Sequence, residues 1–170
     1  MQKLLIVFTI RDYKLEDQNN LVRLYQSVFA EPPWNEQWTE EQVCEDLQFA
    51  QKQKNPIIVV ASLENRLLGF SWGYDLPIDK FQFLRGYVNP DANYMDEIAV
   101  EQNSRRKGIA TEITISYLLE VKSSQVILRT DRRNKASMAL FKNFGFKPVK
   151  DKDNNDVYDP KFKERIYLKK

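Results

Sequence analysis

The sequence predicts an α/β protein, because short apolar segments rich in β-branched residues alternate with segments of helical periodicity. Two apolar segments, 56–61 and 66–74, flank a turn at 64–65 and are typical of a β-hairpin. A third, 94–100, leads through a basic turn with a glycine into an apolar helix. The 170 residues, 42% of them hydrophobic, suit one compact domain that spans 1–170.

Before the hairpin, the sequence predicts one strand and two helices. The apolar, β-prone segment 4–10 is expected to form the first strand. Apolar residues at 21, 24, 25, 28 and 29 lie on one face of a helix, which the run Glu31-Pro32-Pro33 ends. Thr39 and Gln42 form a capping-box pattern, so a second helix is expected from there to about residue 52.

After the hairpin, the segment 79–93 has no clean period and is expected to be a loop or a short extra turn. The elements expected next are a strand at 94–100, a helix at 105–122, a strand at 125–131 and a helix at 135–144, capped by Gly145. A polar, turn-rich segment at 151–159 precedes a last strand at 165–168.

The most specific signal in the chain is the segment Arg105-Arg106-Lys107-Gly108-Ile109-Ala110. The first N–H groups of a helix have no intrahelical partner, and together with the helix dipole they favour a phosphate. Gly108 removes a side chain that could block close approach of a ligand, and three basic residues precede it. The segment therefore predicts an anion site, although a basic helix start can also simply face solvent.

Together with residues downstream, this segment resembles the cofactor motifs of the GNAT superfamily of acetyl-CoA-dependent N-acetyltransferases. The R-x-x-G-x-A pattern at 105–110 resembles that family's pyrophosphate loop, and Asn134-Lys135-Ala136 with Gly145-Phe146 resembles its second cofactor motif. The resemblance is strong in the C-terminal half and rests only on the order of elements in the N-terminal half. It implies a GNAT fold, in which about four helices flank a central mixed β-sheet with a bulged fourth strand.

The resemblance also implies acetyl-CoA as the cofactor. Main-chain groups of Ile98, Ala99 and Val100, beside the bulge, are expected to bind the pantetheine arm. The backbone from Arg106 to Ala110 is expected to bind the pyrophosphate. The other expected cofactor residues are Arg105, Lys107, Gly108, Ile109 through its N–H, Thr111 through its hydroxyl, Asn134, which can equally cap the helix at 135–144, and Phe141 against the pantetheine.

Two carboxylates, Asp96 and Glu97, are the candidate catalytic residues. Acyl transfer from a thioester to an amine needs a base for the amine proton and a donor for the oxyanion. Because side chains alternate along a strand, we expect the two carboxylates to point to opposite faces. Family members with a base on this strand often place it two residues before the first cofactor contact, which favours Asp96. The oxyanion donor is expected to be the N–H of Ile98 or Val100.

One position departs from the family pattern. Where GNAT enzymes usually carry a tyrosine that protonates the leaving thiolate, this chain has Phe141, which has no proton to donate. Tyr94, Tyr158 and Tyr167 are the alternative donors, unless the thiolate leaves without help. The departure also admits a GNAT fold without transferase activity.

The segment 31–39 lies where the family places its first acceptor loop. Trp34, Glu36 and Trp38 are expected to bind the amine, because carboxylates pair with its charge and indoles offer cation–π faces. The two tryptophans can also simply pack at the helix start. Some aminoglycoside-modifying GNATs carry a similar loop and an aspartate after the fifth strand, where Asp131 stands here. The opposite wall of the acceptor site is expected to comprise Trp72, Tyr74, Phe81, Phe83 and Tyr87.

Composition excludes several other classes of protein. The chain has no histidine, which removes Ser-His-Asp and Cys-His nucleophile arrangements and histidine-based metal sites, and we expect no metal. Its one cysteine permits no internal disulfide. No segment has the pattern of a signal peptide or the length of a membrane span, so we expect a soluble, cytoplasmic protein.

The net charge of +2 hides an asymmetry between the two parts of the chain. Residues 1–104 carry 9 basic and 16 acidic residues, and residues 105–170 carry 17 and 8. A basic part for a polyanionic cofactor and an acidic part for a cationic acceptor explain this, as does a chance distribution of solvated charge. Nothing beyond charge supports binding to nucleic acid, so none is expected.

The sequence thus favours an enzyme that moves an acetyl group from acetyl-CoA to a primary amine of a small molecule, aminoglycoside-like at its most specific. Transfer to a protein N-terminus or a lysine is the alternative reaction. A non-catalytic acyl-CoA-binding regulatory module is the alternative outside the enzymes. Dimers are common in the family, so a homodimer is a further expectation, although no interface patch is evident in the sequence.

Overall fold

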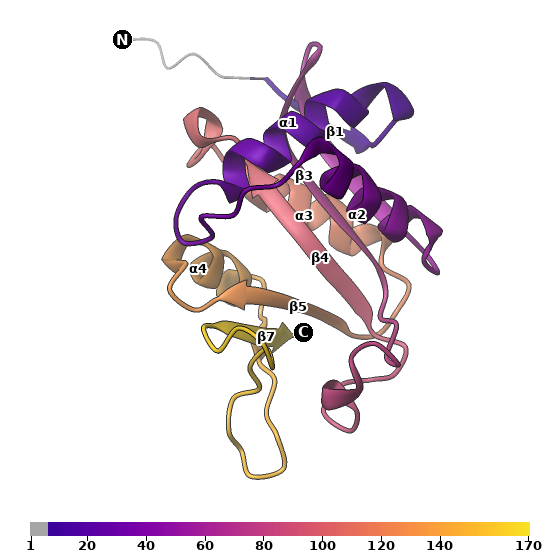
Figure 1. Ribbon diagram of the computed structural model, residues 1–170, viewed down its shortest axis with the longest axis vertical. Coiled ribbons are helices and arrows are strands. Elements are labelled where there is room, and N and C mark those ends of the chain that lie inside the picture. The colour runs from indigo at the N-terminus through magenta and orange to yellow at the C-terminus, as the bar shows by residue number, and fades with distance from the viewer. Residues whose placement is uncertain (1–6) are drawn as a thin grey trace.

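The structure is a computed structural model that describes residues 7–170 (Figure 1). Helices and strands alternate along the chain, as the sequence predicts. They are β1 (Thr9–Asp12), α1 (Gln18–Phe29), α2 (Glu40–Lys52), β2 (Ile57–Leu63), β3 (Arg66–Asp75), β4 (Asn93–Val100), α3 (Ile109–Glu120), β5 (Val126–Asp131), α4 (Lys135–Asn143), β6 (Lys147–Pro148) and β7 (Arg165–Lys169). None of the helices in this described range has the length and apolar character needed to cross a membrane.

The seven strands form one sheet in the order β1-β2-β3-β4-β5-β7-β6. All neighbouring strands pair antiparallel except β4 and β5, which run parallel, so the sheet is mixed as expected. Helices α1 and α2 cover one face of the sheet, and α3 and α4 pack on the other (Figure 1). This arrangement confirms the predicted α/β class and the predicted GNAT fold.

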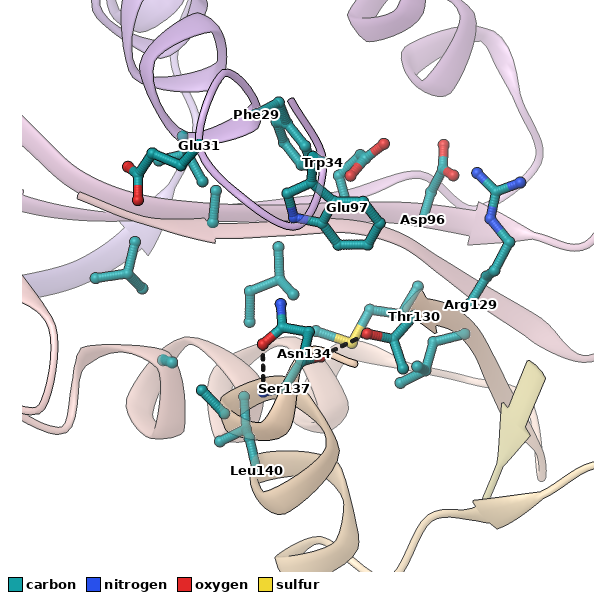
Figure 2. Close-up of a pocket in the computed structure, with 18 of the residues that line it drawn as sticks. Phe29, Glu31, Trp34, Asp96, Glu97, Arg129, Thr130, Asn134, Ser137 and Leu140 are labelled. Atoms are coloured by element: carbon teal, nitrogen blue, oxygen red, sulfur yellow. Dashed lines mark hydrogen bonds between the residues drawn. The ribbon is translucent and has the colours of Figure 1, made fainter. Parts of the chain in front are cut away.

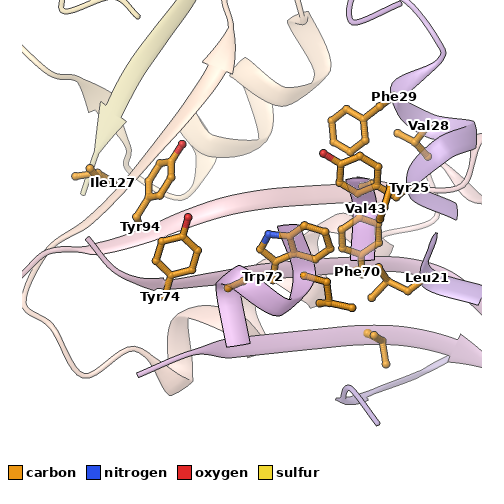
Figure 3. Close-up of a cluster of buried hydrophobic side chains, with 14 of the residues drawn as sticks. Leu21, Tyr25, Val28, Phe29, Val43, Phe70, Trp72, Tyr74, Tyr94 and Ile127 are labelled. Carbon is orange, nitrogen blue, oxygen red and sulfur yellow. The ribbon is translucent and has the colours of Figure 1, made fainter. Parts of the chain in front are cut away.

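The core between the sheet and α1–α2 is built on stacked aromatic side chains (Figure 3). Trp72 on β3 is fully buried and stacks on Tyr25 of α1, with ring centroids 5.5 Å apart, and on Phe70, 5.0 Å away. Tyr25 also contacts Phe29 one turn later, at 4.3 Å. Large buried rings dominate core energetics, so this stack holds α1 firmly across the middle of the sheet.

Local signals in the N-terminal half agree with the structure where it is described. The Thr39 hydroxyl accepts from the Gln42 N–H at 3.2 Å, and the Gln42 side chain accepts from the Thr39 N–H at 2.9 Å, which confirms the capping box. Residues 4–6 of the predicted first strand lie outside the described residues, and β1 begins at Thr9. The segment 79–93 is a loop with one 3₁₀ turn at Gln82–Leu84, as expected.

A β-bulge interrupts β4 at Asp96. Trp72 of β3 pairs with Glu97, whereas the next residue, Gly73, pairs with Met95, so Asp96 is the extra residue of the bulge. A bulge breaks the alternation of side chains and bends the strand. The predicted bulge in the fourth strand is therefore present, and it begins two residues before Ile98.

Strands β4 and β5 separate soon after they meet. Their pairing is confined to Asn93–Met95 on β4 and Val126–Leu128 on β5. Beyond Met95 the two strands diverge in a V, and α4 lies beside its open end (Figure 1). From Asp96 to Val100, the side of β4 that faces β5 therefore has no strand partner.

The basic turn before α3 is not helical, so the predicted helix start at residue 105 is wrong by four residues. A 3₁₀ turn at Gln102–Ser104 comes first, and Arg106 and Gly108 then adopt left-handed conformations, with φ of 58° and 83°. Such residues cannot continue a right-handed helix, so α3 begins at Ile109. Gly145 ends α4 with φ of 84°, as predicted.

Candidate functional site

A cavity of about 1030 Å³ opens where β4 and β5 separate (Figure 2). The loop between α1 and α2, strand β4, the turn before α3 and the start of α4 form its walls. Most of the residues predicted for the site line this cavity, namely Trp34, Glu36, Trp38, Asp96, Glu97, Ile98, Ala99, Val100, Arg105, Arg106, Gly108, Ile109, Ala110, Thr111, Asn134 and Phe141. Lys107 and Asp131 do not line it.

One end of the cavity is built from backbone at the start of α3. Glu112 is the first residue of this helix whose N–H donates to a carbonyl of the first turn, at 3.0 Å to Gly108. The N–H groups of Ile109, Ala110 and Thr111 come before it and have no intrahelical acceptor. With the helix dipole, they make this end of the cavity a receptor for an anionic group.

The basic side chains of the same turn have different hydrogen-bond partners. Arg105 forms a two-pronged ion pair with Glu31 at 2.7 and 3.1 Å, and its Nε donates to the Val100 carbonyl at 3.0 Å. Lys107 donates to the Asn103 carbonyl at 2.7 Å, on the outside of the turn. Arg105 thus ties the turn to the loop after α1, and Arg106 contributes to the cavity wall.

The two carboxylates of β4 point to the same face of the sheet (Figure 2). Tyr74 donates to Asp96 Oδ2 at 2.9 Å, and Tyr25 donates to Glu97 Oε1 at 3.3 Å. Both tyrosines belong to the core on the α1–α2 side. The expectation of opposite faces is therefore wrong, because the bulge at Asp96 interrupts the alternation on which it rested.

Burial raises the pKa values of three acids in this cavity, and for Glu97 and Asp46 the charge of Asp96 adds to the rise. Burial raises the pKa of Asp96, and the hydrogen bond from Tyr74 and the charge of Arg129 oppose that rise. Burial and the charge of Asp96 raise the pKa of Glu97 well above its usual value. On α2, partial burial and the charges of Asp96 and Glu45 raise the pKa of Asp46 to about 6. Like charges within one cavity disfavour the simultaneous ionisation of these acids.

The other end of the cavity is bounded by the loop between α1 and α2. The Trp38 indole donates to Glu36 Oε2 at 2.9 Å, and Glu36 also pairs with Arg165 at the start of β7. The Arg165 guanidinium lies 5.1 Å from the Trp34 ring. Arg165 thus joins the two sides of the cavity across its acidic end.

The predicted tryptophans both line the cavity and pack against the core. Trp34 contacts Phe29 at 5.8 Å, and Trp38 meets Tyr25 edge-on at 5.4 Å. The packing interpretation of these tryptophans is therefore confirmed, and their binding of the amine stays a prediction. Of the five aromatic residues expected on the opposite wall, only Tyr74 lines the cavity, and the others pack into the core: Trp72, Phe81, Phe83 and Tyr87.

The α4 side of the cavity carries three polar side chains. Asn134 Oδ1 caps the helix by accepting from the Ser137 N–H at 3.1 Å, which leaves its amide group on the cavity side (Figure 2). Hydroxyl oxygens of Thr130 and Ser137 lie 2.8 Å apart. One turn after Ser137, Phe141 packs edge-on against Phe146 and adds no polar group.

Besides Lys107, four predicted polar residues lie outside this cavity. Tyr94, Tyr158 and Tyr167 do not line it, so none of the three expected proton donors faces the site. Asp131 is buried and accepts from the backbone and the guanidinium of Arg133, at 2.8 and 2.7 Å. Along β5 the cavity is lined by Leu128, Arg129 and Thr130, whereas the Asp131 carboxylate is held by Arg133 outside it.

A family model described as the acetyltransferase (GNAT) family matches residues 19–146, which is well over half of the chain. The chain belongs to the GNAT family. It is accordingly an acetyl-CoA-dependent acyltransferase, and the GNAT cofactor is acetyl-CoA. No curated protein matches the sequence significantly.

Solved structures share the same fold at low sequence identity. A protein of Pyrococcus horikoshii is 18% identical, with a TM-score of 0.73 over 96% of this chain and 98% of that one. A ribosomal-protein-alanine N-acetyltransferase of Brucella melitensis is 17% identical, with a TM-score of 0.70 over 95% and 98%. The PaiA N-acetyltransferase of Thermoplasma acidophilum, solved with coenzyme A, is 14% identical, with a TM-score of 0.66 over 96% and 98%.

Sequence reasoning missed several residues of this GNAT cavity. Asp46 and Phe49 lie three residues apart on α2, and this spacing places them on one helix face. That spacing is the sequence pattern from which their shared place in the cavity could have been predicted. No sequence pattern marks Thr130 or Ser137 as a site residue, because they meet only when β5 and α4 pack together in the fold. Arg165 and Phe162 come from the end of the chain, and only the sheet order brings them to the loop after α1.

Proposed function

We propose that this GNAT enzyme transfers an acetyl group from acetyl-CoA to a primary amine of a small cationic molecule. The observation that carries the proposal is the acidic end of the cavity. Asp46, Asp96 and Glu97 line it, and within residues 7–170 none of the three forms an ion pair with a lysine or arginine. Unpaired carboxylates in a partly buried cavity favour a cation as their ligand.

The backbone end of the cavity supports acetyl-CoA as the donor. In our proposal the N–H groups from Arg106 to Thr111 bind the pyrophosphate, with the charges of Arg106 and nearby Lys107 adding attraction. The unpaired edge of β4 from Ile98 to Val100 binds the pantetheine arm as a further strand does. The thioester is then delivered toward the carboxylates on β4.

Asp96 is the proposed base. Burial raises the pKa of both acids, but the hydrogen bond from Tyr74 and the charge of Arg129 favour the ionised form of Asp96, whereas the charge of Asp96 further disfavours that of Glu97. Asp96, directly or through a water, removes a proton from the amine, which attacks the thioester carbonyl. An N–H of Ile98 or Val100 stabilises the oxyanion.

The bridge at the acidic end favours a small molecule over a protein as the acceptor. Arg165 pairs with Glu36 and lies over Trp34, so it links the loop after α1 to the start of β7. A peptide needs an open groove between these two segments. A compact amine fits beneath the bridge, against the aromatic side chains of Trp38 and Phe49.

The test is thiol release from acetyl-CoA by the purified protein with aminoglycosides, polyamines and short peptides as acceptors. We expect release with a small amine and not with peptides, and loss of release in Asp96→Asn. Asp91→Asn, in an exposed loop, is the matched control and keeps full activity. Release with peptides alone contradicts the proposed acceptor. Binding of acetyl-CoA without release on any amine favours a non-catalytic cofactor-binding module.

A further inference from the structure

Two hydroxyl groups lie side by side on the α4 side of the cavity, along the proposed path of the cofactor. Thr130 and Ser137 line the cavity from the end of β5 and the first turn of α4, and their oxygens lie 2.8 Å apart. Thr130 is buried and Ser137 is half-buried. Asn134 fixes the backbone of Ser137 by capping the helix, so the hydroxyl is held in place by two neighbours (Figure 2).

The hydroxyl pair faces the route from the anion-binding turn to the carboxylates. A cofactor arm that starts at Gly108 and ends near Asp96 passes through the V between β4 and β5, because that is where the cavity runs. The unpaired edge of β4 forms one wall of this passage. The start of α4, with Ser137, forms the other.

Little else on that wall can donate a hydrogen bond to a leaving sulfur. The other side chains that β5 and α4 contribute are mostly apolar, namely Leu128, Ala136, Leu140 and Phe141. Arg129 donates to Asp159 through Nη1 at 2.6 Å, and Asn134 accepts at the helix cap through its oxygen, which leaves its amide N–H groups to donate. Three tyrosines that the sequence offered as donors lie outside the cavity. Apart from the remaining N–H groups of Arg129, whose charge acts on Asp96, the donors on this wall are the two hydroxyls and the Asn134 amide.

We propose that Ser137, supported by Thr130, is the hydrogen-bond donor to the thiolate that leaves acetyl-CoA. This inference rests on the proposed acyl transfer. The amine nitrogen bonds to the carbonyl carbon, and its proton passes to Asp96. The carbon–sulfur bond then breaks with its electron pair on sulfur. Ser137 donates a hydrogen bond to that thiolate, which takes up a proton from solvent as coenzyme A departs, so no proton is lost from the hydroxyl.

The role of Thr130 follows from the direction of the hydrogen bonds. One hydroxyl cannot donate to its neighbour and to the sulfur at once. When Thr130 donates to Ser137 Oγ, the Ser137 proton is free to point into the cavity. Thr130 is therefore a positioning residue, and Ser137 contacts the reacting sulfur.

Steady-state kinetics of Ser137→Ala test the proposal, with acetyl-CoA and the amine that the wild type turns over fastest. We expect kcat to fall about tenfold while the KM values for both substrates stay within twofold, since the donor acts only as charge develops on sulfur. Thr130→Val is expected to lower kcat about threefold, because only the orientation of the donor is lost. Ser116→Ala on α3, which does not line the cavity, is the matched control and keeps wild-type kcat.

A rescue experiment separates a donor from a merely structural serine. Ser137→Thr keeps the hydroxyl and is expected to retain kcat. Phe141→Tyr, one turn along the cavity wall, is expected to restore kcat in the Ser137→Ala background. Unchanged kcat in Ser137→Ala overturns the inference. The inference is also overturned if the kcat lost in Ser137→Ala is neither retained by Ser137→Thr nor restored by Phe141→Tyr, and the melting temperature falls as well. A wild type without turnover on any amine refutes the proposed acyl transfer itself, and the inference falls with it.

Discussion

The two ends of the cavity are built from different parts of the chain. The anion-binding end consists of the backbone of one continuous segment, with left-handed residues at Arg106 and Gly108 before α3. The acidic end consists of side chains from α2, β4 and the loop after α1, brought together by the sheet. A site built from backbone groups keeps its ligand when side chains are substituted. A site built from side chains can come to prefer a different ligand after a substitution. The backbone end therefore suits the proposed binding of acetyl-CoA, and the side-chain end suits the proposed recognition of one acceptor.

The largest expected effect is at the acidic end, on the carboxylate of the proposed base. Asp96→Asn is expected to lower kcat by about a hundredfold or more, because an amide cannot accept the amine proton. Acetyl-CoA binding, measured by calorimetry, is expected to be unchanged.

Glu97→Gln tests whether Asp96 or Glu97 is the base. If Glu97 is protonated in the working enzyme, the amide preserves its hydrogen bonding, and kcat is expected to fall by less than about tenfold. A larger loss from Glu97→Gln than from Asp96→Asn reverses the assignment of the base.

At the anion-binding end, a backbone change is expected to outweigh a charge change. Gly108→Val is strained at φ of 83° and is expected to raise the dissociation constant of acetyl-CoA by more than about tenfold, or roughly 1.4 kcal/mol. Lys107→Ala is expected to raise it by less than about threefold, since that side chain is directed to the Asn103 carbonyl. Equal effects in calorimetry contradict the view that backbone makes this end of the site.

A smaller effect on KM is expected from a change at Asp46, and we expect it to differ between acceptors with one and with two positive charges. Asp46→Asn is expected to raise KM about fivefold for a diamine, because one partly solvated ion pair is lost. For a monoamine of the same length, KM is expected to stay within about twofold. Equal KM changes for both acceptors exclude a contact between Asp46 and a second amino group.

The smallest expected effect is on stability as a function of pH. The pKa of Asp46 is raised from 3.8 to about 6 in the folded protein, so folding favours its protonated form. That stabilisation is present below pH 3.8 and is lost as the pH rises through 6. Asp46→Asn is therefore expected to raise the melting temperature by about 2 °C at pH 8 and to leave it unchanged at pH 3.5. A shift of the same size at both pH values assigns the effect to packing.

The contrast between the ends also explains what the sequence could predict. The capping box at Thr39, the glycine at the end of α4 and the R-x-x-G-x-A turn are local patterns, and each appears in the structure where the pattern places it. The helix start at 105 was wrong because two left-handed residues precede α3, and their conformations depend on the turn as a whole.

The acidic end could be predicted only in part, because its geometry is not local. The orientation of Glu97 depends on a bulge whose position comes from the pairing with β3. Asp131 looked equivalent to an acceptor-binding residue by its place after the fifth strand, yet its partner is Arg133 two residues away. The pairing of Thr130 with Ser137 requires β5 and α4 to be docked, and no spacing rule anticipates it.

The bulge on β4 has a counterpart on the neighbouring strand that contacts no part of the cavity. A side chain at Gly73 places its Cβ 2.0 Å from the Tyr117 hydroxyl and 2.2 Å from the Tyr94 carbonyl oxygen. The bare backbone at Gly73 lets Tyr117 of α3 and the Tyr94 carbonyl approach β3 closely beside the bulge. Saturation mutagenesis selected on activity alone will therefore mark Gly73 as intolerant, like a residue of the reaction centre. Its task is architectural, since it makes room for α3 and for the backbone of β4 next to the bulge.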